Sequence, residues 1–80
     1  MSYNGWKNRA TWNVILWIKN DEGLYRSAVR FMQTYTGSSP YRDFIAWLGL
    51  TSAKTSDGVQ WLDKSLDHAE LDEAMKEFAE

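Results

Sequence analysis

The chain has 80 residues, of which 44% are apolar and 15% aromatic, with a formal net charge of −2 and no cysteine. Without cysteine it can form neither disulfides nor thiolate zinc sites, and thiol catalysis is excluded as well. Because a secreted domain of this size usually carries disulfides, the composition favours a reducing, cytoplasmic location.

Length and apolar content predict one small domain over residues 1–80, with no linker or repeat. No stretch approaches the roughly 18 apolar residues of a membrane helix, and the N-terminus lacks a signal-peptide core, so we expect a soluble protein with no membrane contact. Residues 1–8 read as an irregular lead-in, since Asn4 and Gly5 favour turns.

A first helix is expected over about Arg9 to Lys19, with Asn8 as its N-cap. Two sets of residues recur there at helical spacing: Trp12, Ile15 and Leu16, and Thr11, Ile15 and Ile18. The β-branched residues in this stretch also leave a strand open, because short apolar runs are ambiguous by periodicity. We favour the helix.

A second helix is predicted after Asn20, which is its expected N-cap, and should end near Thr36 with Gly37 in the left-handed conformation. Its apolar stripe is Leu24, Ala28, Phe31 and Tyr35, widened by Tyr25 and Met32, with Arg26, Arg30 and Gln33 on the other side.

A third helix should start at Pro40, with Ser39 as N-cap, and end at Gly49. Its buried stripe is predicted to be Tyr41, Phe44, Ile45 and Leu48, with Trp47 at one edge. Residues 50–58 are rich in Thr, Ser and Lys and read as an exposed loop.

Residues 59–62 could be a short strand or one helical turn. A last helix follows, in which Asp67 and Glu70 predict a capping box and Leu66 and Leu71 a hydrophobic staple. The inward residues should be Leu71, Ala74, Met75 and Phe78, and the outward ones Asp72, Glu73, Lys76, Glu77 and Glu80. The prediction is therefore an all-α, single-domain bundle of about four helices, with a short irregular or extended segment near residues 59–62.

Three segments, NRATWNVILWIKNDEGLYRSAV, PYRDFIAWLGL and DGVQWLDKSLDHAELDEAM, resemble an uncharacterised family of small proteins from bacteria, cyanobacteria and their phages. The similarity covers nearly the whole chain. It implies a single intracellular domain that could derive from a mobile element, and it assigns no activity, cofactor or catalytic residue.

Charge is distributed unevenly along the chain. Residues 1–54 carry seven basic and three acidic side chains, a net +4, whereas residues 55–80 carry two basic and eight acidic ones, a net −6. Either the two halves pack together and partly neutralise each other, or one face meets a charged partner. The acidic last helix could enter a basic groove on another protein, or it could simply be solvated.

The residue inventory argues against catalysis. His68 is the sole histidine, and neither a G-x-S-x-G elbow nor a glycine-rich phosphate loop is present. The carboxylates of the last helix do not follow a calcium-loop pattern. We therefore predict no catalytic, cofactor-binding or metal-binding residue, and no enzyme.

Binding of a macromolecule remains, most plausibly of a protein. Tryptophan, tyrosine and arginine are the residues that dominate protein interfaces, and Trp17, Trp47 and Trp61 fall at the margins of their stripes or in the uncertain segment. The predicted partner-binding residues are Trp17, Arg26, Arg30, Tyr41 and Trp47. Self-association through the same surface is equally consistent.

Nucleic-acid binding is the alternative. Basic residues are interleaved with aromatic ones up to Trp47, and two helices joined by a short break could place Arg26 and Arg30 toward a groove of DNA. Against this, the sequence pI of about 5.3 and the few basic residues do not make a convincing patch.

Overall fold

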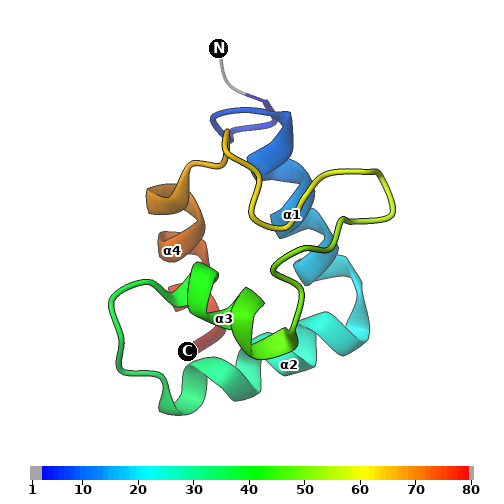
Figure 1. Ribbon diagram of the computed structural model, residues 1–80. Helices are drawn as coiled ribbons and strands as arrows, with labels where there is room; N and C mark the ends of the chain where they lie inside the picture. Colours follow the sequence, from blue (N-terminus) through cyan, green and yellow to red (C-terminus); the bar gives the residue numbers. More distant parts are fainter. Residues whose placement is uncertain (1–2, 80) are drawn as a thin grey trace.

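The computed structural model describes residues 3–79, which form four α-helices and no β-strand (Figure 1). The elements are α1 (Arg9–Asn20), α2 (Glu22–Thr34), α3 (Pro40–Leu48) and α4 (His68–Lys76), followed by a 3₁₀ turn, η1 (Glu77–Ala79). This confirms the prediction of a small all-α protein with about four helices.

Helix α1 begins as predicted, because the side-chain oxygen of Asn8 accepts a hydrogen bond from the backbone N–H of Thr11 at 2.9 Å. Only one of the two helical spacings marks the core. The set Thr11, Ile15 and Ile18 is buried. Trp12, from the other set, lies outside the core and packs against Tyr3, with the rings tilted by 52° and their centroids 4.9 Å apart.

Both ends of α2 differ from the prediction. Asn20 is the last residue of α1, and Asp21 is the N-cap of α2, accepting from the N–H of Leu24 at 3.0 Å. At the other end, α2 stops at Thr34, and Gly37 is not in the left-handed region. Glycine at this position leaves room for a side chain instead: a Cβ on Gly37 would lie only 2.7 Å from Cζ of Tyr35, so the tyrosine ring would have to move.

Helix α3 starts at Pro40 and ends at Gly49, whose φ of 75° lies in the left-handed region. The chain beyond it is irregular. Residues 59–62 form neither a strand nor a helical turn: Gln60 makes an isolated bridge to Lys54, and Trp61 is buried. The preceding loop is not fully exposed either, since Thr55 is buried.

Helix α4 is capped by Asp67, which accepts from the N–H of Glu70 at 3.0 Å, but the reciprocal half of the predicted capping box is absent. The Glu70 carboxylate accepts instead from the N–H of Lys7, and the N–H of Asp67 donates to Thr11. The predicted inward face is confirmed, with Leu71, Ala74, Met75 and Phe78 all buried.

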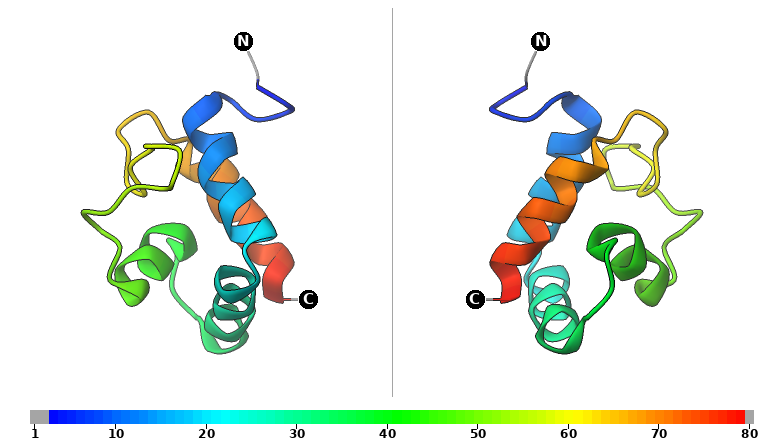
Figure 2. Two further views of the ribbon diagram at one scale, coloured as in Figure 1. Left: turned by 90° about the vertical axis from the view of Figure 1, so that its right-hand side faces the viewer. Right: turned by 90° about the vertical axis from the view of Figure 1, so that its left-hand side faces the viewer.

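The buried apolar side chains form one core to which all four helices and residues 59–66 contribute. Helices α1 and α4 slope in the same direction and contact each other, while α2 crosses beneath them and packs against α3 (Figures 1 and 2). None of the helices within residues 3–79 has the length and apolarity needed to cross a membrane.

Candidate functional site

The polar side chains at the N-cap and in the first turn of α1 form hydrogen bonds within the chain. The side-chain amide of Asn8 donates to the carbonyl of Ser65 at 2.6 Å, and the Thr11 hydroxyl accepts from the N–H of Asp67 at 3.0 Å. These bonds fix the start of α4 against the start of α1. The first half of the NRATWN segment is therefore structural.

The second half of that segment anchors the loop before residue 59. Asn13 is fully buried; its oxygen accepts from the Thr55 hydroxyl at 2.7 Å and its nitrogen donates to the Asp57 carboxylate at 2.8 Å. The indole N–H of Trp17 donates to the same carboxylate oxygen at 3.0 Å. The hydrogen bonds from Asn13 and Trp17 lower the pKa of Asp57. We call these four residues, Asn13, Trp17, Thr55 and Asp57, the loop anchor.

The structure separates the five predicted partner-binding residues. Tyr41 is fully buried and donates from its hydroxyl to the carbonyl of Trp61 at 2.6 Å, so it offers no surface to a partner. Burial also raises its pKa. Trp17 is half-buried in the loop anchor. Arg26, Arg30 and Trp47 remain exposed.

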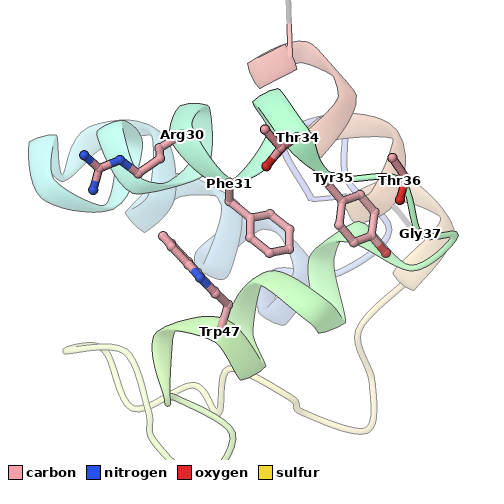
Figure 3. Close-up of a pocket in the computed structure, with 7 residues that line it drawn as sticks. All are labelled: Arg30, Phe31, Thr34, Tyr35, Thr36, Gly37 and Trp47. Carbon is pink, nitrogen blue, oxygen red and sulfur yellow. The ribbon is translucent and has the colours of Figure 1, made fainter.

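Two of these exposed residues, Arg30 and Trp47, line one concave surface of about 390 Å³ between the end of α2 and the face of α3 (Figure 3). Its full lining is Arg30, Phe31, Thr34, Tyr35, Thr36, Gly37 and Trp47, and we call it the α2/α3 groove. Trp47 extends from α3 toward α2 and is 52% exposed. Its ring centroid lies 5.4 Å from that of Phe31, which also stacks on Tyr35 at 5.0 Å.

One end of the groove is held in place by Tyr35. Its hydroxyl donates to the Asp43 carboxylate at 2.5 Å and accepts from the N–H of Ser39 at 2.9 Å. Desolvation and the bond to Asp43 raise the pKa of Tyr35. The tyrosine ring thus forms a fixed wall above Gly37, because both of its polar contacts come from the following loop and α3.

The other end of the groove is basic. Among residues 3–79, the ion pairs involve Lys19, Arg26 and Lys76, and none involves Arg30. Arg30 also lines a second concavity of about 290 Å³ with Arg26 and Ser27, which we call the basic recess. Arg26 pairs with Glu22, and both side chains are largely exposed. The aromatic groove therefore continues along α2 into a basic surface.

The acidic half of the chain is only partly neutralised by the basic half. The Lys19 ammonium lies 4.0 Å from the Glu77 carboxylate and 5.9 Å from the Trp6 ring centroid. Around Trp6, the glutamates at 70, 73 and 77 border a shallow concavity of about 220 Å³. Of these, Glu70 already accepts the N–H of Lys7.

Within residues 3–79, no group of three or more acidic, histidine or cysteine side chains is placed to hold a metal ion. His68 lies edge-on against Tyr41, with ring centroids 6.0 Å apart. Sequence reasoning placed Phe31 and Tyr35 in the core stripe and missed that they line the groove. The sequence did contain one indication of the groove. Phe31 directly follows Arg30 and lies four residues before Tyr35, which puts one basic and two aromatic side chains near the same helix end.

A protein-family model described as a family of unknown function (DUF7249) matches residues 1–80. No curated protein and no solved structure matches the chain.

Proposed function

The chain belongs to a family of unknown function, DUF7249, and we propose that it is a small binding module that takes a protein partner in the α2/α3 groove. The observation that carries the proposal is the half-exposed Trp47 beside Phe31 and Tyr35, with Arg30 at the edge. Tryptophan, tyrosine and arginine in a concave setting are the residues that contribute most to protein interfaces.

The size of the groove supports the same role. A volume of about 390 Å³ is at the lower end of the range for ligand sites and suits one large side chain of a partner. Trp47 is also the most exposed of the large apolar residues in the described chain, at 52%. Covering it would remove apolar surface from water, which favours association.

A nucleic acid is the alternative partner, because Arg26 and Arg30 lie one helical turn apart beside the aromatic groove. Two carboxylates argue against it. Glu22 pairs with Arg26 at one end of this surface, and Asp43 bonds to Tyr35 at the other. A phosphate backbone that follows the groove would meet both negative charges, whereas a protein segment can match mixed charges.

The proposal places the module in the cytoplasm, which the absence of cysteine from the sequence supports. It includes the bacterial, cyanobacterial or phage setting and the mobile-element origin that the sequence resemblance implies. It assigns no catalytic residue and no cofactor.

The test compares partner capture by the tagged protein and by Trp47→Ala from host lysate, with and without nuclease treatment, read by mass spectrometry. Tyr3→Ala is the matched control, since Tyr3 is also an exposed aromatic residue, at 40%, but does not line the groove. We expect a stoichiometric protein that Trp47→Ala loses and Tyr3→Ala retains. Recovery of nucleic acid, with proteins that vanish on nuclease treatment, would favour the alternative, and recovery of only a second copy of the chain would indicate self-association.

A further inference from the structure

We infer that the partner enters the α2/α3 groove as an extended segment that places an apolar side chain beside Trp47 and two carboxylates on Arg30 and Arg26, away from Asp43. This inference rests on the proposed function and adds the chemistry of the partner. It follows from the continuity of two surfaces, because Arg30 lines both the aromatic groove and the basic recess.

The aromatic part of the surface accepts an apolar anchor. The rings of Phe31 and Trp47 pack at an angle of 45° with their centroids 5.4 Å apart, and Tyr35 forms the end wall. The volume of about 390 Å³ is too small for an α-helix, whose diameter with side chains is about 10–12 Å, to be enclosed. The space therefore takes a single large side chain of the partner.

The basic part accepts carboxylates. Arg30 has no ion-pair partner among residues 3–79, although its guanidinium can form two parallel hydrogen bonds with one carboxylate. Arg26 is paired with Glu22, but an exposed pair of this kind contributes only about 0–1 kcal/mol, so a partner carboxylate can compete for it.

The spacing of the two arginines specifies the pattern in the partner. Residues four apart on a helix have Cβ atoms about 5–6 Å apart. Acidic residues two positions apart in an extended segment are separated by about 6.6 Å and point to the same side. We therefore expect two acidic residues at positions i and i+2, next to the apolar anchor.

The test is a selection of random 12-residue peptides displayed on phage, with wild-type protein as bait and depletion on Trp47→Ala. We expect the enriched peptides to share an apolar residue close to two acidic residues two positions apart. The affinity of a synthetic enriched peptide should fall about tenfold or more on Arg30→Glu. It should change less than about twofold on Arg42→Glu, because Arg42 is exposed on α3 and lines neither concavity.

A reciprocal exchange adds a readout that a merely structural effect would not produce. A peptide in which one acidic residue is replaced by arginine should bind Arg30→Glu better than it binds the wild type. Enriched peptides without acidic residues, an unchanged affinity on Arg30→Glu, or no peptide that depends on Trp47 would each overturn the inference. If the peptide selection fails but capture of a folded protein from lysate still depends on Trp47, the proposed function stands and only the inference about the partner's chemistry is overturned. If neither the captured protein nor any selected peptide depends on Trp47, both the proposed function and the inference are contradicted.

Discussion

The loop anchor of α1 and the α2/α3 groove both combine aromatic rings with polar side chains, but they use them in opposite ways. In the loop anchor, Asn13 and Trp17 direct their polar atoms to residues of the same chain. In the groove, Arg30 and Trp47 face solvent. The most distinctive stretch of the sequence thus builds the fold, and a plainer amphipathic helix carries the candidate site.

The difference follows from what each region has to hold. Residues 49–67 contain no helix or strand, and side chains at the start of α1 help to hold them. Asn8 donates to the backbone carbonyl of Ser65, and Asn13 accepts from the Thr55 hydroxyl. Every buried side-chain nitrogen and oxygen within residues 3–79 has a hydrogen-bond partner. Helices α2 and α3 satisfy their own backbones and are held by the core, so their outer residues are free to meet a partner.

Replacing Asn13 by Ala should have the largest effect on stability. It leaves the buried Thr55 hydroxyl without its acceptor and removes one of the two side-chain donors to the Asp57 carboxylate, which should lower the free energy of unfolding by about 2–3 kcal/mol. Urea denaturation measures this, with Asn20→Ala at the exposed end of α1 as the control. A loss no greater than that of the control would remove the distinction between the two regions.

Replacing Trp47 by Ala should affect stability less and binding more. Because Trp47 is 52% exposed, we expect the free energy of unfolding to fall by only about 1–2 kcal/mol. Partner capture should be lost. If thermal and urea melts show a larger loss than for Asn13→Ala, Trp47 belongs to the core and not to a binding surface.

Gly37→Ala should move the ring of Tyr35, the end wall of the groove, while lowering the stability of the fold only slightly. The new Cβ would collide with the ring of Tyr35 and displace it from Asp43. We expect the free energy of unfolding to fall by less than about 1 kcal/mol, since the segment is exposed, while affinity for the partner drops. Ser38→Ala, one residue away, is the control, and equal affinities of the two variants would show that the wall is not used.

The smallest expected effect is a pH dependence confined to the loop anchor. Hydrogen bonds from Asn13 and Trp17 lower the pKa of Asp57 in the folded state, so the ionised carboxylate stabilises the fold above its unfolded pKa of about 3.9. That contribution is lost as the pH falls through the lower, folded pKa. The stability advantage of the wild type over Asp57→Asn should therefore shrink on acidification, measured by urea denaturation between about pH 6 and 3. An advantage that is constant with pH would show that the ionised form is not what Asn13 and Trp17 recognise.

The helices could be predicted from the sequence because their signals are local. Asn8, Pro40, Gly49 and Asp67 each mark a helix end as predicted. Two conflicting predictions for Tyr41 followed from the sequence. Helical spacing placed it correctly in a buried stripe, whereas the basic residues near it led to the wrong prediction of a partner-binding role. Its buried hydroxyl bonds to the carbonyl of Trp61, 20 residues away, and no local pattern reveals such a contact.

The groove was only partly predictable for the same reason. The position of Trp47 at the edge of its stripe indicated exposure, and Arg30 lies opposite the apolar stripe of α2. That Phe31 and Tyr35 meet Trp47 depends on how α3 packs against α2, and on the loop that Gly37 allows to pass close to Tyr35. These contacts arise from tertiary packing.

The most direct test of the account is hydroxyl-radical footprinting of the captured complex, read by mass spectrometry at each aromatic residue. We expect the partner to protect Trp47, Phe31 and Tyr35, while Trp12 and Trp6 react as in the free protein. Protection centred on Trp6 and the acidic face of α4, with Trp47 unchanged, would contradict binding in the α2/α3 groove. It would show that the partner binds the acidic surface of the protein instead.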